Sequence, residues 1–288
     1  MSGALRGTLH CRLALHRRPS MNRFLPAAAL ALMLVHAAPA RAADDRPPRG
    51  ASVLMLVGRA LHVAHFVPGP TVRDGDKAGL IVASTCKHVP DDTRLTLAAV
   101  AWNAGKEDEK SLVLALVDEG AAKVVAALQD VVNEDAATQI EAYSLRLDTA
   151  AYDLAPGVRA VGLDIVNENR SCGEGGLGPS RTLYVREGAT FRPVLADLAM
   201  SQYWYVRGNQ RRCVSDRQAA ETAILEDFDV VIGLGAPGKD GWRDLALTAT
   251  SKRSDRKPGR KPLHVRVPYD GQAYPLQAFD KAYEKWRQ

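Results

Sequence analysis

Residues 181–195 read RTLYVREGATFRPVL, two runs of alternating apolar residues separated by Glu187-Gly188. Glycine adopts a positive φ without steric cost, so an acidic residue followed by glycine between two such runs predicts a β-hairpin. Two further stretches repeat the pattern: SLVLALVDEGAAKVVAAL (111–128), with Glu119-Gly120, and LHVRVPYDGQAYPL (263–276), with Asp270-Gly271. The chain is therefore expected to be rich in antiparallel hairpins.

A second element precedes each hairpin at a similar distance. The stretches DDTRLTLAAV, PGVRAVGLDI and DGWRDLALTA align on Arg94, Arg159 and Arg243, which lie 26, 29 and 28 residues before the turn glycine. A further apolar run precedes each arginine. These features predict a repeated four-stranded antiparallel meander. The units are expected near 79–130, 142–197 and 229–278. The predicted fold class is all-β, with propeller-like, barrel and sandwich arrangements all open.

The three aligned arginines have a structural interpretation. An arginine at the start of the second strand can reach a carboxylate or a carbonyl group in the preceding loop and hold the strand pair in register. We therefore assign Arg94, Arg159 and Arg243 to the scaffold and not to a ligand site.

Helices are expected at two places. Residues 215–228 (SDRQAAETAILEDF) begin with capping residues and predict a short helix, and residues 277–288 predict an amphipathic helix at the C-terminus. Residues 51–67 are too uniformly apolar for their period to distinguish a helix from a strand pair.

The N-terminus has the pattern of a secretory signal peptide. A basic segment beginning at Met21 precedes the 12-residue apolar run FLPAAALALMLV (24–35), which is followed by Ala40-Arg41-Ala42. Residues 1–20 are either upstream of a start at Met21 or a long basic extension of the signal peptide. We expect cleavage after Ala42 and residues 43–288 to form a single exported β-rich domain, either periplasmic or secreted. The apolar run is shorter than the roughly 20 residues that a membrane-spanning helix needs. No later segment predicts a membrane span.

Without residues 1–42 the charge of the chain changes sign. The whole chain has a formal net charge of +5, but this leader holds six arginines and no acidic residue, so the remainder carries −1. Binding of nucleic acid is not predicted. The remaining cysteines are Cys86, Cys172 and Cys213, and an oxidising compartment favours one disulfide among them. Three pairings are open; Cys172–Cys213 is favoured because both lie in polar loops.

The stretch NRSCGEGGLGPS (169–180) contains the spacing G-x-G-x-x-G. A dinucleotide site needs a helix N-terminus after the glycines, but Pro179 and a strand-like run follow them here. We therefore predict a long exposed loop and no nucleotide cofactor. His62, His65, Cys86 and His88 lack a recognised metal-binding spacing, so no metal site is predicted either.

Two segments predict a binding face. Tyr203, Trp204 and Tyr205 lie beside arginines in QYWYVRGNQRR (202–212), and SKRSDRKPGRKP (251–262) carries six cations against one acidic residue. Exposed aromatic rings stack on sugars or anchor partners, and cations attract anionic surfaces. The candidate binding residues are Tyr203, Trp204, Tyr205, Arg207, Arg211, Arg212, Lys252, Arg253, Arg256 and Lys257.

SLRLDTAAYDLAPGVRAVGL (144–163), RTLYVREG (181–188) and GWRDLALTAT (241–250) resemble uncharacterised secreted proteins of Gram-negative bacteria, a resemblance that implies no activity. DGWRDLAL also resembles the FG-GAP repeat of propeller proteins, through Asp240, Gly241 and Asp244. Ala236 and Gly238 stand where that repeat has acidic residues, so its calcium site is not carried over.

We predict non-catalytic binding of an envelope protein or an anionic glycan. No G-x-S-x-G motif is present, although paired carboxylates come together only in space and leave no mark in a sequence. A periplasmic hydrolase with a carboxylate or Cys/His site, and a secreted inhibitor or scaffold, are the alternatives.

Overall fold

The computed structural model describes residues 50–68, 78–106, 108–135, 139–166, 175–207 and 223–288. Within these residues the fold is all-β, with three sheets, the α-helices α1 (Gly50–Ala60) and α3 (Gln277–Arg287), and a short 3₁₀ turn, η2 (Lys239–Gly241). Among the described residues no sheet closes into a barrel, and the sheets stack as in a sandwich. The predicted signal peptide lies outside the described residues.

Sheet A corresponds to the first predicted unit. Its order is β1-β2-β3-β4-β5, in which the short β1 runs parallel to β2 and the other four strands form an antiparallel meander. The strands are β1 (Val67–Pro68), β2 (Leu80–Val89), β3 (Asp92–Asn103), β4 (Glu109–Asp118) and β5 (Lys123–Asn133).

Sheet B corresponds to the second predicted unit. Its order is β10-β9-β7-β6, and every pair is antiparallel. The hairpin quoted at 181–195 is formed by β9 and β10, with Gly188 at φ 62° in the turn. The strands are β6 (Leu145–Ala155), β7 (Val158–Ile165), β9 (Ser180–Glu187) and β10 (Thr190–Ala199).

Sheet C departs from the third predicted unit. Its order is β14-β13-β12-β11-β8, so the first three strands of the unit are present but the fourth is not. The strands are β8 (Gly175–Leu177), β11 (Ser201–Arg207), β12 (Ile224–Pro237), β13 (Arg243–Arg253) and β14 (Leu263–Val267). After Gly271 the chain enters α3 instead of returning along β14.

The reason for this departure lies in residues 268–276. Pro268 directly follows β14, and Pro275 lies where the fourth strand would run, and proline removes a donor from a ladder. The Tyr274 amide instead donates to the Val194 carbonyl oxygen of β10 at 2.7 Å, and the Tyr274 hydroxyl donates to the Arg243 carbonyl oxygen at 2.6 Å. The predicted hairpin at Asp270-Gly271 is therefore a turn without a second strand.

Sheets B and C share a continuous ribbon. β8 leads into β9, and β10 leads into β11. Where these two segments pass from one sheet to the other, they are joined by hydrogen bonds from the Gly178 amide to the Ser201 oxygen and from the Met200 amide to the Pro179 oxygen, each 2.8 Å. Register shifts on either side of Leu195 accompany the crossing. Such irregularities let strands turn between packed sheets.

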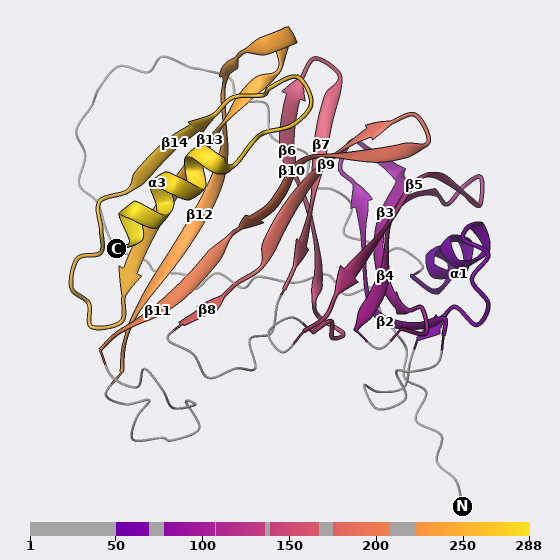
Figure 1. Ribbon diagram of the computed structural model, residues 1–288. Helices are drawn as coiled ribbons and strands as arrows, with labels where there is room; N and C mark the ends of the chain where they lie inside the picture. The colour runs from indigo at the N-terminus through magenta and orange to yellow at the C-terminus, as the bar shows by residue number, and fades with distance from the viewer. Residues whose placement is uncertain (1–49, 69–77, 107, 136–138, 167–174, 208–222) are drawn as a thin grey trace, which may run out of the picture.

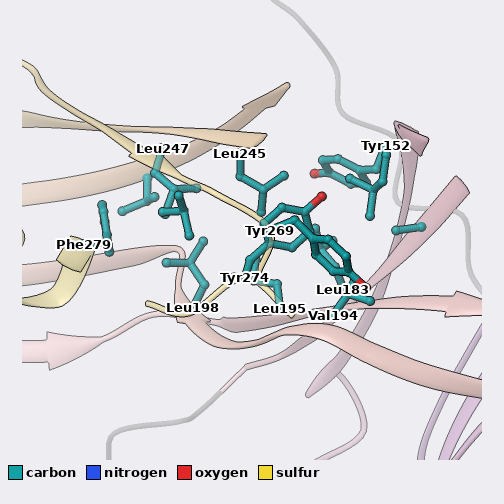
Figure 2. Packing of buried hydrophobic residues seen from close by; sticks show 14 of the residues in the cluster. Tyr152, Leu183, Val194, Leu195, Leu198, Leu245, Leu247, Tyr269, Tyr274 and Phe279 are labelled. Carbon is teal, nitrogen blue, oxygen red and sulfur yellow. The ribbon is translucent and has the colours of Figure 1, made fainter. Parts of the chain in front are cut away.

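The layers follow one another as α1, sheet A, sheet B and sheet C (Figure 1). Sheet A is covered on both sides, which explains why Thr96–Asn103 of β3 form an unbroken buried run. Alternate residues of β3 face α1 on one side and sheet B on the other. Figure 2 shows the core between sheets B and C, where Leu183 and Val194 meet Leu245 and Tyr274, and Phe279 joins from α3.

The predicted helices have different outcomes. The C-terminal helix is confirmed as α3, which lies across sheet C with Phe279 and Tyr283 buried (Figure 1). Of residues 51–67, which the sequence left open between a helix and a strand pair, those up to Ala60 belong to helix α1. The helix near 215–228 is wrong in its described part, because residues 224–228 belong to β12; residues 215–222 lie outside the described residues.

The glycine-rich stretch is also different from the prediction at its described end. Residues 175–177 form β8, which pairs with β11, so they are not an exposed loop. A Cβ atom at Gly175 would lie 2.3 Å from the Tyr203 oxygen, and one at Gly176 would lie 2.2 Å from the Tyr203 ring. The glycines permit this close approach of β11. Residues 169–174, with Cys172, lie outside the described residues.

Candidate functional site

The two predicted binding segments lie on adjacent strands of sheet C. β11 pairs with β12 and β12 with β13, so that Trp204, Glu226 and Arg253 form one row across three strands. Tyr203, Asp227 and Lys252 form the next row. Segments separated by about 50 residues in the chain are thus in direct register.

The rows point to opposite faces of the sheet. Phe228 and Val230 mark the inner face, which sheet B and α3 cover, and Trp204 and Arg253 share it because neighbours in one row project to the same side. Tyr203, Tyr205 and Lys252 project to the outer face. The aromatic segment is therefore divided between two faces.

Tyr205 is not accessible to a ligand. It is only 6% exposed, and its ring meets that of Tyr203 edge-on at 6.0 Å. Tyr203 is half-buried over Gly176. Of the three predicted aromatic residues, Trp204 alone is exposed, by 40%.

We define the tryptophan face as Leu177, Trp204, Val206 and Arg287. Leu177 and Val206 are 55% and 41% exposed. Leu177 lies on the same side of the sheet as Trp204, and Val206 follows two residues after Trp204 at a register shift of β11. The Arg287 guanidinium, from the last turn of α3, lies 5.3 Å from the centre of the Trp204 ring. A cation over an indole is attracted by the negative face of the ring, so the face combines an apolar platform with a positive charge.

A buried carboxylate lies beside the tryptophan face. Glu226 is 4% exposed, and its Oε1 is 3.4 Å from Nε of Arg260. Arg253, in the same row, makes a bidentate pair with Asp255, with distances of 3.1 Å and 2.9 Å. These hydrogen bonds from Arg253 lower the pKa of Asp255 to about 2. Arg253 and Arg260 are therefore held in place by carboxylates.

The basic loop, residues 254–262 between β13 and β14, is attached to α3. Arg260 donates from Nη1 to the Trp286 oxygen at 2.8 Å, and the Trp286 indole donates to the Lys261 oxygen at 2.7 Å. A guanidinium at a helix C-terminus satisfies orphan carbonyl groups and complements the helix dipole. Arg256 and Lys257 are exposed, and within the described residues no ion pair neutralises them.

The remaining predicted binding residues are Arg207, Arg211 and Arg212. Arg207 ends β11 and is exposed. Arg211 and Arg212 lie outside the described residues, as do Cys172 and Cys213 of the predicted disulfide. Sequence reasoning missed Glu226 and Arg287, because the first was assigned to a helix and the second was treated only as part of the C-terminal helix.

The three aligned arginines begin β3, β7 and β13 and make different contacts. Arg94 pairs with Asp92 of its own strand at 2.8 Å, and Arg243 donates to the Gly235 oxygen at 2.9 Å. Arg159 pairs with Asp91, which belongs to the turn between β2 and β3, and so joins the second unit to the first. Each contact is to a carboxylate or a carbonyl group of the scaffold.

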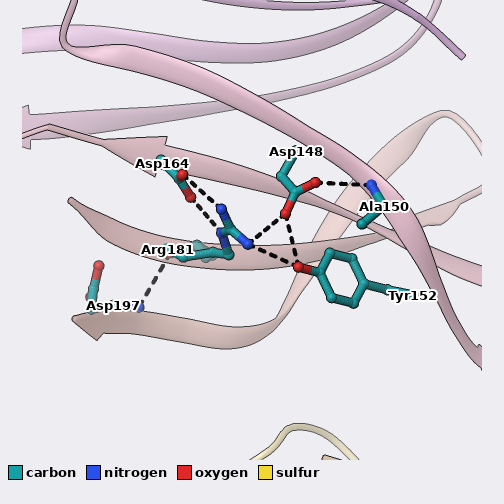
Figure 3. A network of polar contacts seen from close by, with 7 residues as sticks. Asp148, Ala150, Tyr152, Asp164, Arg181 and Asp197 are labelled. Atoms are coloured by element: carbon teal, nitrogen blue, oxygen red, sulfur yellow. Dashed lines mark hydrogen bonds and ion pairs between the residues drawn. The ribbon is translucent and has the colours of Figure 1, made fainter. Parts of the chain in front are cut away.

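A second polar cluster lies on the face of sheet B that meets sheet C (Figure 3). Arg181 forks onto Asp164 at 2.6 Å and 2.8 Å and also contacts Asp148. The Tyr152 hydroxyl lies 2.8 Å from both Arg181 and Asp148. Burial raises the pKa of Tyr152 to about 12. The guanidinium is shared by two carboxylates, so this cluster is an internally satisfied scaffold network.

A third cluster lies at one end of sheet A. Thr96 is fully buried, and its hydroxyl donates to Glu119 Oε1. His88 Nδ1 lies 3.1 Å from the Thr96 hydroxyl oxygen. Cys86 lies two residues before His88 and packs near the core between α1 and sheet A. Among the described residues no three His, Cys, Asp or Glu side chains are placed to hold a metal ion.

Neither α1 nor α3 has the length and apolar character to cross a bilayer, and the described parts of the chain contain no other α-helix. Comparison of the chain with family models, curated proteins and solved structures found no match.

Proposed function

We propose that the protein is an exported, non-catalytic binding protein, and that its tryptophan face and basic loop bind an anionic glycan of the cell envelope. Export is inferred from the signal-like pattern of residues 1–42. The observation that carries the binding proposal is Trp204, exposed by 40% beside the Arg287 guanidinium, at the edge of a loop with uncompensated cations.

The chemistry of this surface suits a charged sugar. The apolar side of a sugar ring packs against an indole, as other apolar surfaces do, while guanidinium groups donate paired hydrogen bonds to phosphate or carboxylate groups. Arg287 is positioned to do this next to Trp204, and Arg256 and Lys257 extend the positive field along the loop. Arg253 is paired with Asp255 and Arg260 with Glu226, so these two arginines stabilise the scaffold beside the tryptophan face.

Binding can be measured by calorimetric titration of residues 43–288 with the phosphorylated core oligosaccharide of lipopolysaccharide. We expect Trp204→Ala and Arg287→Ala each to weaken binding about tenfold, the scale of one lost stacking or cation–π contact. Arg256→Ser with Lys257→Ser should weaken binding and reduce its dependence on salt.

Tyr143→Ala is the matched control, because Tyr143 is an aromatic residue 74% exposed in the segment before β6. It should leave the affinity unchanged. Absence of binding by the unmodified protein, or equal binding by Trp204→Ala, would falsify the glycan proposal. Co-purification of an envelope protein that depends on Trp204 would instead identify a protein ligand for the same face.

A hydrolase is the second candidate, and one arrangement favours it. His88, Thr96 and Glu119 form a chain of hydrogen bonds, and Cys86 lies two residues from His88 on the same side of β2. An imidazole oriented in this way can activate a thiol. Alkylation of Cys86 by iodoacetamide should then proceed well below pH 8 and slow in His88→Ala; the profile of an ordinary thiol in both proteins would exclude it.

A further inference from the structure

The outer edge of β14 is open. Sheet C ends at β14, and within the described residues no hydrogen bond joins the outward backbone groups of Leu263–Val267 to another segment. α3 contacts β14 from the inner face of the sheet, where the Trp286 indole reaches the Lys261 oxygen. Unpaired edge groups of this kind are templates for another strand.

The other two units show what occupies the equivalent edge. In sheet A the third strand of the unit, β4, pairs antiparallel with β5, and in sheet B β9 pairs antiparallel with β10. β14 is the third strand of its unit and has no fourth, because residues 273–276 turn away to sheet B. The vacant position is therefore one that the same fold fills twice with an antiparallel strand.

The side chains of β14 restrict the occupant. His264 and Arg266 are exposed on the outer face, while Leu263, Val265 and Val267 alternate with them toward the inner face. Arg266 donates from Nε to the buried carboxylate of Asp244, and its side chain is otherwise exposed. A second copy of β14 paired antiparallel about Val265 would place His264 opposite Arg266 and would bring no carboxylate to either residue. An acidic strand would place carboxylates at these positions.

We propose that the β14 edge binds an extended acidic segment of a partner protein as an added antiparallel strand. Backbone hydrogen bonds supply affinity in this mode, and alternate side chains supply specificity. The segment carries Glu or Asp opposite His264 and Arg266 and apolar residues opposite Leu263, Val265 and Val267. This surface lies on the opposite edge of sheet C from β8 and is independent of the glycan proposal.

The test uses residues 43–288 and two synthetic peptides, one alternating valine with glutamate and one alternating valine with lysine. Amide hydrogen exchange of β14, followed by mass spectrometry, should slow about tenfold with the glutamate peptide and not with the lysine peptide. His264→Glu should weaken the effect of the glutamate peptide. Lys123→Glu, which reverses an exposed charge on β5, is the matched control and should not.

Three results would overturn the proposal. Exchange that neither peptide slows would show that the edge does not accept a strand. Equal slowing by both peptides would show that charge does not select the occupant. A dimer seen by sedimentation, with β14 protected before any peptide is added, would show that a second copy of the chain occupies the edge.

Discussion

Arg260 donates a hydrogen bond from Nη1 to the Trp286 oxygen, 2.8 Å away, while its Nε lies 3.4 Å from the buried carboxylate of Glu226. One side chain of the basic loop thus joins the C-terminus of α3 to β12. Its guanidinium also lies 5.9 Å from the centre of the Phe228 ring. This cation belongs to the scaffold on which the tryptophan face is built, although the sequence showed it only as one of the six cations of residues 251–262.

Replacing Arg260 is therefore expected to destabilise the fold. Arg260→Ala leaves Glu226 buried without its ion-pair partner and removes a cap from α3, which should lower the free energy of unfolding by about 3 kcal/mol. Urea unfolding of residues 43–288 measures this loss. Lys257→Ala, an exposed cation of the same loop, is the control and should change stability by less than about 0.5 kcal/mol. Equal effects would show that Arg260 is as solvated as its neighbour.

The glycine at position 175 should be essential for the position of Trp204. A Cβ atom there would lie 2.3 Å from the Tyr203 oxygen and 2.9 Å from the Trp204 ring, so Gly175→Ala must displace β8 or the indole. We expect a loss of about 1–3 kcal/mol and faster amide exchange in β11. Gly120→Ala is the control, because the nearest atom to its added Cβ is an Asp118 oxygen at 3.4 Å. Unchanged exchange in Gly175→Ala would contradict the close packing.

The hairpins of sheets A and B were predictable from the sequence, whereas the role of Gly175 was not. The alternation on both sides of Glu119-Gly120 and Glu187-Gly188 predicted the meanders of sheets A and B, because the pattern and the turn are both local. The role of Gly175 was not readable, because it depends on contact with Tyr203 and Trp204, which lie beyond β9 and β10 in the sequence.

The errors in the third unit have the same origin, with one exception. Tyr274 occupies a buried site against Val194 and Arg243, a long-range contact with no sequence signal, although Pro268 and Pro275 already disfavoured a fourth strand. The misassigned helix did carry a signal. Phe228 and Val230 are buried while Asp227 and Asp229 are exposed, a period of two that indicates a strand. The strand assignment of β12 could have been anticipated from that period, but its register with β11 and β13 could not.

The Arg181 network should make a large contribution that depends on all its members. Arg181→Met leaves Asp164, 7% exposed, and Asp148 facing each other without a cation, and we expect a loss of about 3 kcal/mol. Urea unfolding of Arg181→Met, of Asp164→Leu and of the double variant measures the coupling between the two residues. The double variant should recover part of the loss, since it no longer buries that uncompensated carboxylate. A double variant as unstable as the sum of its single variants would argue against a coupled network.

The hydroxyl of Tyr283 should be a liability of the fold in alkaline solution. It is buried, and among the described residues it has no hydrogen-bond partner. Burial raises its pKa to about 12, against about 10 in the unfolded chain, so the folded state favours the neutral phenol. Its contribution is fully present below about pH 10 and is lost as the pH rises toward about 12.

Tyr283→Phe should accordingly be as stable as the unmodified protein at pH 7, or more stable by about 1 kcal/mol, and should lose less stability between pH 10 and pH 12. Tyr274→Phe is the matched comparison, because its hydroxyl donates to the Arg243 oxygen at 2.6 Å, and its loss should cost about 1 kcal/mol at pH 7. Thermal unfolding at several pH values measures both. If Tyr283→Phe were the less stable of the two at pH 7, the Tyr283 hydroxyl would have a partner, and its burial would not be a cost to the fold.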